Sequence, residues 1–505
     1  MLWRRVFTIS GWTLVSRILG LVRDRLWAGA QGGSLMLDCF LVAFQLPNLL
    51  RNLFGEGALS AAFIPRYVQA RERSPEEAEL FAGLVLTRLT IALSALAVVG
   101  MAACVVALLL GSGRTAIVAA LALPMVPYLV FVCVAAIMGG VLHGRRHFWA
   151  PACAPVLLNL SLIATVGLEL DEECWYLPYA VLGGGIASLF LHLAALASSG
   201  GVPPGRWRVP TPAIGERLRE LLRAYLPTVF ASGVHQINAW LDAVIAMAFV
   251  AGNGAVAVLY FANRLLQFPL AMIGHGVATA AYPELASAAL EGWRRTVAWL
   301  RPALAALWYW LLPAALGLAA VAEPLVRAIY QVGQFDERLV ERTVLATRLY
   351  ALALIPQACT RLLMRAFHAH REQATPVRIS LWMIVANLLL NLALVQTPLA
   401  EAGIALAAAI SAAFGCGLYL RALRGHAAPL PLAWRECRRP LLAALAMAAA
   451  VLALLQLWPQ PAGGGSAIAA LRLAVVVVVG ALLYIVLAGR PPTLPARRSE
   501  AAADD

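Results

Sequence analysis

The sequence predicts an all-α polytopic membrane protein with about fourteen transmembrane helices: two six-helix lobes around a central cationic cavity, followed by two further helices. Three observations predict this class. The 505 residues are 62% hydrophobic and only 13% charged, and their mean hydropathy is +0.79. Apolar runs of about 20 residues, the length that a helix needs to cross a bilayer, recur between short loops with Arg, Gly or Pro. Segments of the first half also recur in the second half.

The expected spans follow one another with short interruptions. Spans 1 to 4 cover about 3–28, 35–63, 80–110 and 117–142, span 5 begins near Pro151, and span 6 ends near Ala197. A Gly/Pro-rich break and a basic amphipathic segment, GERLRELLRAY, come next and fit a helix at the membrane surface. We therefore expect an N-terminal lobe at 1–200, a cytoplasmic linker with this interfacial helix at 201–223, a C-terminal lobe at 224–426, spans 13 and 14 within 427–490, and a cytoplasmic tail at 491–505.

Three segments recur in the same order in the two lobes. Residues 55–65, GEGALSAAFIP, are similar to 274–283, GHGVATAAYP; 143–151, HGRRHFWAP, to 368–376, HAHREQATP; and 157–162, LLNLSL, to 389–394, LLNLAL. Because each lobe would contain an even number of spans, both would enter the membrane in the same orientation, as parallel repeats. Substrate sites in transporters of this kind lie between the repeats.

The basic charge indicates how the chain is oriented. The formal net charge is +13, and all basic charge apart from histidine is arginine, because the chain has no lysine. The arginines lie mostly in alternate short loops rather than on one soluble face, so we expect no nucleic-acid partner. The positive-inside rule then places these loops, and both termini, in the cytoplasm. None of the eight cysteines forms a CxxC pair, and we expect neither a disulfide nor a bound metal at them.

Charged residues inside the apolar runs indicate the substrate. Spans 1 and 2 carry Arg17, Arg23, Asp24, Asp38, Arg51 and Glu56, and span 8 carries Arg264. Each such charge costs about 2.5 to 3.5 kcal/mol at the centre of an inserting helix, so together they need partners or a water-filled space. Arginines only partly offset by acids make a cationic cavity for an anion, and guanidinium binds phosphate oxygens in pairs. In the alternative interpretation, Arg17 and Arg23 reach the interface or form structural ion pairs with Asp24 and Asp38.

A second group of polar residues suits a monovalent cation. Asn238 and Asp242 in span 7, and Asn387 and Asn391 in span 11, are each spaced one helical turn apart. One carboxylate with amide oxygens can hold a hard cation, although the same side chains also make hydrogen bonds between membrane helices. The choice between these two interpretations stays open. No motif of a metalloprotease, serine hydrolase or nucleotide-binding loop is present, so we expect no enzyme.

Several segments resemble one known family. SRILGLVRD, FLVAFQLPNLLRNLFGEGALSAAFIPRY and YFANRLLQFP are similar to the MurJ (MviN) family of lipid II flippases, within the multidrug/oligosaccharidyl-lipid/polysaccharide exporter superfamily. The resemblance implies fourteen helices, two lobes around a V-shaped cavity, and a groove from spans 13 and 14 for the lipid tail. It also implies that Arg17, Arg23, Arg51 and Arg264 bind the substrate head group, beside the acids Asp24 and Asp38. Asp242, Asn387 and Asn391 match positions that bind sodium in some members, where a second acid stands in place of Asn391.

The resemblance implies a function without bond chemistry. We expect translocation of lipid II, the undecaprenyl-pyrophosphate-linked peptidoglycan precursor, from the cytoplasmic to the periplasmic leaflet by alternating access. Membrane potential would drive the cycle, with Na+ or H+ as coupling ion and no other cofactor. We expect a monomer in contact with membrane lipids and with proteins of cell-wall synthesis. The alternatives are export of another undecaprenyl-pyrophosphate-linked glycan and a non-transporting scaffold for cell-wall synthesis.

Overall fold

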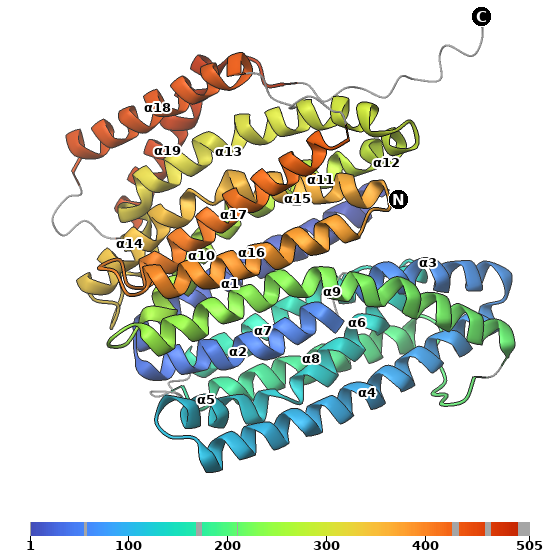
Figure 1. Cartoon of the computed structure of the whole chain (residues 1–505). Coiled ribbons are helices and arrows are strands. Elements are labelled where there is room, and N and C mark those ends of the chain that lie inside the picture. The colour runs from blue at the N-terminus through green and yellow to red at the C-terminus, as the bar shows by residue number, and fades with distance from the viewer. Residues whose placement is uncertain are drawn as a thin grey trace, which may run out of the picture. The chain divides into compact units, whose positions relative to one another are not determined.

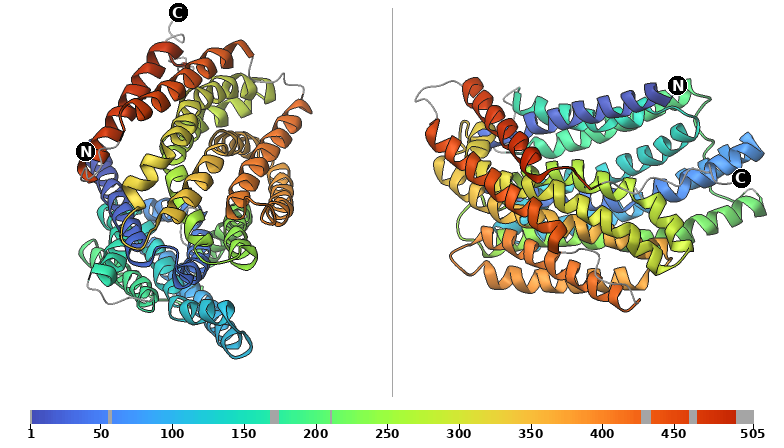
Figure 2. Two further views of the ribbon diagram at one scale, coloured as in Figure 1. Left: turned by 90° about the vertical axis from the view of Figure 1, so that its left-hand side faces the viewer. Right: turned by 90° about the horizontal axis from the view of Figure 1, so that it is seen from above.

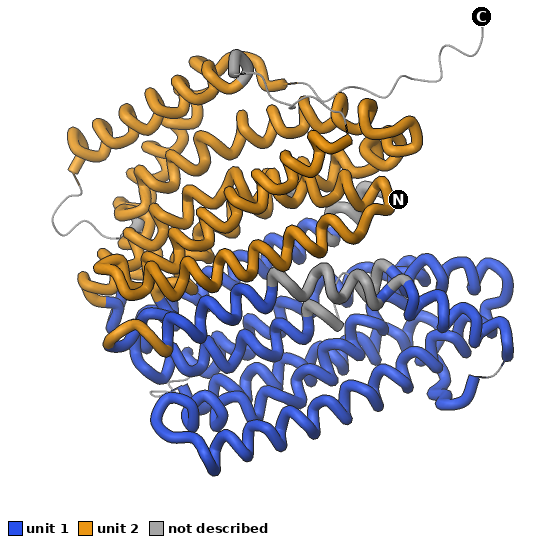
Figure 3. The backbone as a smooth tube through the Cα atoms, viewed as in Figure 1, with its two compact units in different colours: residues 1–247, 252–257, 332–335 blue, residues 248–251, 258–331, 336–505 orange. Residues whose placement is uncertain are grey.

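The computed structural model describes residues 2–54, 58–167, 174–209, 211–426, 434–459 and 466–492, and these residues form helices and no strand (Figure 1). They divide into two compact units, coloured separately in Figure 3. Unit 1 comprises residues 1–247, 252–257 and 332–335, and unit 2 comprises residues 248–251, 258–331 and 336–505. Glu56 lies outside the described residues.

Unit 1 is built from the first nine α-helices and a short 3-10 helix. They are α1 Leu2–Gln31, α2 Leu35–Phe54, α3 Ala58–Arg73, α4 Pro75–Leu110, α5 Arg114–Ala122, η1 Leu123–Met125, α6 Tyr128–Gly144, α7 Trp149–Gly167, α8 Leu177–Ser198 and α9 Pro212–Phe249, whose last two residues belong to unit 2. Helix α1 packs on α7, α7 packs on α8, and α3 packs on both α4 and α6. The sequence caps α4 locally, because the Ser74 side chain accepts a hydrogen bond from the Glu77 backbone N–H and Pro75 follows the cap.

Unit 2 contains the remaining helices. They are α10 Ala255–Pro269, whose first three residues belong to unit 1, the π-helical turn η2 Leu270–Gly274, α11 His275–Ala280, α12 Tyr282–Leu290, α13 Trp293–Tyr330, α14 Glu337–Ala351, α15 Leu354–Ala369, α16 Ala374–Leu394, α17 Glu401–Arg424, α18 Trp434–Leu457 and α19 Ser466–Ala488. Helix α13 packs against α14, α15, α18 and α19, and α17 packs against α14, α15 and α16. The turned views show α18 and α19 beside α13 (Figure 2).

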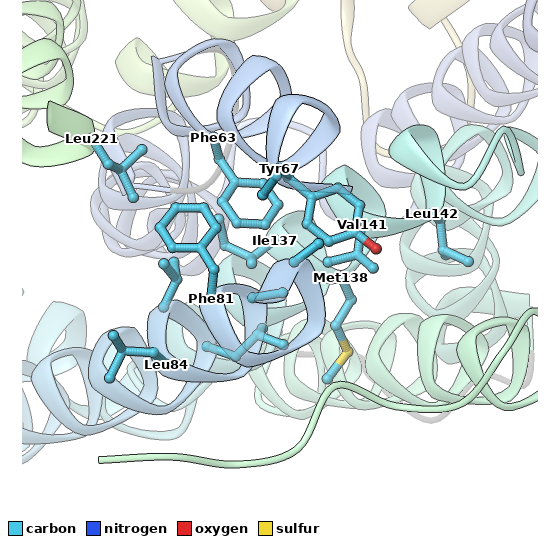
Figure 4. Close-up of a cluster of buried hydrophobic side chains, with 14 of the residues drawn as sticks. Phe63, Tyr67, Phe81, Leu84, Ile137, Met138, Val141, Leu142 and Leu221 are labelled. Atoms are coloured by element: carbon cyan, nitrogen blue, oxygen red, sulfur yellow. The ribbon is translucent and has the colours of Figure 1, made fainter. Parts of the chain in front are cut away.

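The core of unit 1 lies where α3, α4, α6 and α9 meet. Phe63 and Tyr67 stack on one another, and Phe63 also stacks on Phe81, with ring centroids 5.6 and 5.7 Å apart (Figure 4). Ile137 and Val141 of α6 complete this cluster, and all five side chains are fully buried. Close packing of these rings gives many dispersion contacts, so this cluster fixes α3 on the rest of unit 1.

Ten helical segments of the described chain are long and apolar enough to cross a membrane. Helix α1, which carries Arg17, Arg23 and Asp24, is not among them. The predicted total of fourteen spans therefore stays a prediction. Helix α9 runs without a break from Pro212 to Phe249, so the basic segment expected as a separate interfacial helix is the first part of a longer helix.

The two copies of the sequence repeat end a helix in the same way. After α6, Arg146 has a φ of 65°, its N–H donates to the His143 carbonyl, and the next N–H donates to the carbonyl of Leu142. After α15, Arg371 has a φ of 59°, and the same two bonds reach His368 and Phe367. This is the Schellman arrangement, with arginine where glycine is usual. The shared and uncommon backbone geometry supports the duplication inferred from sequence.

Candidate substrate-binding site

A buried ion pair lies in the C-terminal half of α1. Nη2 and Nε of Arg23 donate to Oδ1 of Asp24 at 2.7 and 3.1 Å. Asp24 is 0% exposed and Arg23 is 5% exposed, and the guanidinium carbon lies 4.6 Å from the centre of the Trp27 ring. Arg23 can be interpreted from the sequence either as a ligand for an anion or as part of a structural ion pair. In this conformation it forms the ion pair with Asp24. A buried charge of this kind is tolerated because a partner and further donors and acceptors surround it.

Asn159 of α7 completes this network. Its Oδ1 accepts a hydrogen bond from Nη1 of Arg23 at 3.0 Å, and its Nδ2 donates to the backbone carbonyl of Ser16 at 3.1 Å. Sequence reasoning used Asn159 only as a marker of the repeat, where it is the counterpart of Asn391. The signal was present in the sequence, because a polar residue inside an apolar run indicates a polar partner on another helix. The network joins α1 to α7 and fixes the direction of the Arg23 side chain.

Asp38 has a structural partner far away in the sequence. Its two carboxylate oxygens accept hydrogen bonds from the backbone N–H groups of Gly254 and Ala257, at 2.7 and 2.8 Å. These groups belong to the start of α10, where backbone N–H groups have no partner within the helix. Asp38 is 3% exposed, and its negative charge also interacts favourably with the positive end of the α10 dipole. Asp38 therefore acts as the N-terminal cap of a helix that begins more than 200 residues later.

The other predicted arginines are less deeply buried than Arg23. Arg17, two turns before Asp24, is exposed. Arg51 is half-buried, and its Nε and Nη2 donate to Oδ1 of Asn48 one turn earlier, at 3.1 and 2.8 Å. Arg264 of α10, in unit 2, is exposed. Arg17 and Arg264 are therefore exposed side chains, and Arg51 is a partly exposed one.

The residues predicted to hold a cation are divided between the two units. Asn387 and Asn391 are both 0% exposed on α16 in unit 2. Asp242 is half-buried on α9 in unit 1, and Oδ1 of Asn238, one turn before it, is buried without a hydrogen-bond partner in the described part of the chain. Oxygen atoms of amides and carboxylates are the ligands that hard cations prefer. The donor chemistry of each pair fits such an ion.

Unit 2 contains an apolar cavity of about 270 Å³ between α13, α18 and α19. Gly317, Met447, Gly480 and Tyr484 are among the residues that line it. Pro313 of α13 also lines the cavity, and it cannot donate the usual helical hydrogen bond to the carbonyl of Tyr309. The hydroxyl of Tyr484 donates to that carbonyl instead, at 2.5 Å. Small residues and a proline thus leave a space whose wall suits a hydrocarbon chain.

Similarity to known proteins extends over most of the chain. A family sequence model described as lipid II flippase MurJ matches residues 28–484. A lipid II flippase MurJ of Burkholderia cenocepacia is 32% identical over 444 residues, which cover 84% of each chain. A probable lipid II flippase MurJ of Rhizobium tropici is 30% identical over 508 residues, which cover 96% of this chain and 92% of that one.

The fold is also similar to solved structures. A lipid II flippase MurJ in an inward closed conformation superposes with a TM-score of 0.73 at 22% identity, covering 94% of this chain and 98% of the other. An inward-facing multidrug resistance transporter of the MATE family, in the MOP superfamily, superposes with a TM-score of 0.68 at 15% identity, covering 81% of this chain and 94% of the other. At these identities the superpositions establish the fold.

Proposed function

The chain belongs to the lipid II flippase MurJ family, as a multi-pass membrane protein, and we propose that it moves lipid II from the cytoplasmic to the periplasmic leaflet of the inner membrane. The observation that carries this proposal is the set of arginines within apolar segments, Arg17, Arg23, Arg51 and Arg264, in a chain of this family. The family is one of transporters and not of catalysts, so no bond is made or broken in the proposed cycle.

The arginines supply the charge that a pyrophosphate needs. Arg17, Arg51 and Arg264 are accessible or half-buried, and each guanidinium can hold two phosphate oxygens. Arg23 starts from a different state, because Asp24 already balances its charge. We propose that the pyrophosphate competes with Asp24 for Arg23, so that substrate binding changes the hydrogen bonds of α1. Asp24, and Glu56 outside the described residues, would then tune the net charge of the site.

The lipid tail needs an apolar surface. The cavity between α13, α18 and α19 is lined almost entirely by carbon atoms. Moving a saturated or isoprenoid chain from lipid into such a space costs little, because both environments are apolar. In the proposed cycle part of the polyprenyl tail rests in this cavity while the head group crosses the membrane.

Alternating access and its driving force are part of the proposal. The arrangement of arginine in alternate loops supports cytoplasmic termini. A membrane potential acts on each unit of moved charge with about 2.3 kcal/mol per 100 mV, and in the proposed cycle this energy drives the return of the empty protein. When an ion such as Na+ is bound, Asp242 with Asn238, or Asn387 with Asn391, would hold it and supply a further gradient. The protein is proposed to work as a monomer, beside enzymes of cell-wall synthesis.

Translocation of labelled lipid II by purified protein in liposomes tests the proposal. We expect transport by the native protein that increases with an imposed potential, and less than about one tenth of it in Arg51→Ala, because a charged hydrogen bond contributes roughly 1.5 to 3 kcal/mol. Arg378→Ala is the matched control, because Arg378 is an exposed arginine of α16 outside the predicted site. Equal transport by Arg51→Ala and native protein would refute the role of the arginines. Transport of another undecaprenyl-pyrophosphate-linked glycan, with none of lipid II, would establish the alternative substrate.

A further inference from the structure

Helix α15 carries a pair of arginines outside the candidate site of spans 1, 2 and 8. Arg361 and Arg365 are one helical turn apart, so they lie on the same face of the helix, and both are half-buried. Like charges at this spacing on a helix repel one another. In the part of the chain that the structure describes, neither has an ion-pair partner. Arg342 of the same unit, in contrast, is paired with Glu401.

The pair lies beside hydroxyl and aromatic groups of α11 and α12. Nη1 of Arg365 donates to Oγ1 of Thr279 at 3.2 Å, and the guanidinium carbon lies 5.9 Å from the centre of the Tyr282 ring. Thr279 and Tyr282 are both exposed. A ligand from outside unit 2 can therefore reach the edge of this arginine pair.

At the corresponding positions of the first repeat the chain carries no charge. At the offset that aligns His368 with His143, Arg365 corresponds to Gly140 and Arg361 to an alanine. A Cβ added to Gly140 would lie 3.0 Å from the Phe63 ring, so in unit 1 the two helices close directly on one another. Phe63 is in turn the counterpart of Tyr282 in the aligned repeat. In unit 2 a guanidinium occupies the place that is closed in unit 1.

Two unneutralised guanidiniums and a hydroxyl form a set of donors for an anion. Planar guanidinium groups one turn apart can each bind two oxygens, so the pair suits a ligand with two linked phosphate groups better than a single carboxylate. Helix α15 ends four residues after Arg365, next to Arg371 in a loop that the positive-inside rule places in the cytoplasm. The site is therefore expected near the cytoplasmic surface.

We propose that Arg361, Arg365 and Thr279 form a second anion site, which binds the pyrophosphate of the lipid-linked substrate near the cytoplasmic entrance. This inference rests on the proposed function and adds a place of first contact to it. A pyrophosphate held here is bound before it reaches the arginines of spans 1, 2 and 8. The site would raise the rate of capture without taking part in the later movement of the head group.

Binding of lipid II to the full-length protein in nanodiscs tests this inference. In Arg361→Gln/Arg365→Gln we expect the Kd for lipid II to rise about tenfold or more, and in Thr279→Val by about threefold. The Kd for phosphatidylglycerol, which has a single phosphodiester, should stay within about twofold of the native value. Arg378→Gln/Arg421→Gln is the matched control, because it removes the same charge from exposed positions of α16 and α17. A thermal unfolding curve accompanies each variant, and loss of two repelling charges should leave the midpoint unchanged or higher.

The outcomes separate this inference from the proposed function. If native protein binds and transports lipid II, and the α15 double variant binds it with unchanged affinity, the second site is refuted and the proposed function stands. The second site is also refuted if the double variant loses affinity for phosphatidylglycerol and lipid II equally. If native protein neither binds nor transports lipid II, both proposals fall. If the double variant unfolds, an unchanged Kd in the folded Thr279→Val variant refutes the site.

Discussion

Replacing Asp24 by asparagine tests whether the α1 ion pair stabilises the fold. Asp24→Asn keeps the shape of the side chain and an acceptor oxygen, but it leaves the Arg23 charge buried and without its counter-charge. Asp24 is 0% exposed and Arg23 only 5% exposed, so water cannot compensate for the loss. Breaking a buried pair by removing one partner typically costs about 3 to 5 kcal/mol. We expect the free energy of unfolding to fall by about this amount.

The double variant Arg23→Gln/Asp24→Asn removes both charges and separates stability from function. Neutral replacement of a buried ion pair is often close to neutral in energy, so we expect most of the lost stability to return. Asn159 can still exchange hydrogen bonds with a glutamine at position 23, because its Oδ1 now faces an amide donor. Lipid II translocation should nevertheless be lost in the double variant, since the phosphate-binding charge of Arg23 is absent.

Reversible unfolding of the purified protein in mixed micelles with increasing denaturing detergent measures these free energies. A double-mutant cycle with the two single variants gives the coupling between Arg23 and Asp24. A cost below about 1 kcal/mol for Asp24→Asn, with additive single effects, would refute the reasoning. Recovery of translocation together with stability would show that the Arg23 charge serves the fold and not the substrate.

Three further predictions concern separate parts of the chain. Asp38→Ala removes the cap of α10 and should lower the free energy of unfolding by about 1 kcal/mol, or about 2 at most. Asp38→Asn keeps a capping oxygen and should lower it less. A larger loss of unfolding free energy in Asp38→Asn than in Asp38→Ala would contradict the capping role. Ala481→Phe should fill the apolar cavity and slow lipid II translocation, while Leu482→Phe at the neighbouring lipid-exposed position should not, and equal rates would exclude the cavity as the tail site. Burial, followed by the hydrogen bond to Glu79, raises the pKa of Tyr67 from 10.0 to about 12. Its stabilising effect is complete below pH 10 and is lost as the pH rises to about 12, so Tyr67→Phe should remove that loss from an unfolding series at high pH.

Sequence patterns predicted the helical class and the long apolar spans because hydrophobicity and helix length are local properties. The Ser74 cap of α4 and the turns at Arg146 and Arg371 also depend on neighbouring residues. The two turns lie in segments 143–151 and 368–376, whose similarity is visible in the sequence. The partner of Asp38 was not predictable, since the backbone groups that it caps lie 216 and 219 residues away and carry no side-chain signal.

The α1 network shows a second limit of sequence reasoning. Helical spacing places Arg17 and Asp24 on one face and Arg23 on an adjacent face, yet the structure pairs Asp24 with its direct neighbour Arg23. A long guanidinium side chain can fold back along the helix, and the presence of Asn159 on α7 decides its direction. Spacing alone therefore identified the charged residues, but the choice of partner depended on a helix distant in the sequence.

Pro313 of α13 makes room for a hydrogen bond between α13 and α19 in the wall of the apolar cavity. Pro313 has no N–H to donate to the Tyr309 carbonyl. The Tyr484 hydroxyl of α19 donates to this carbonyl, so the hydrogen bond joins α19 to α13. Tyr484 also forms part of the cavity wall, so a hydrocarbon chain wide enough to displace its ring must break this hydrogen bond. Filling of the cavity is therefore coupled to the distance between α13 and α19. A hydrocarbon segment narrow enough to leave the Tyr484 ring in place binds without breaking this hydrogen bond.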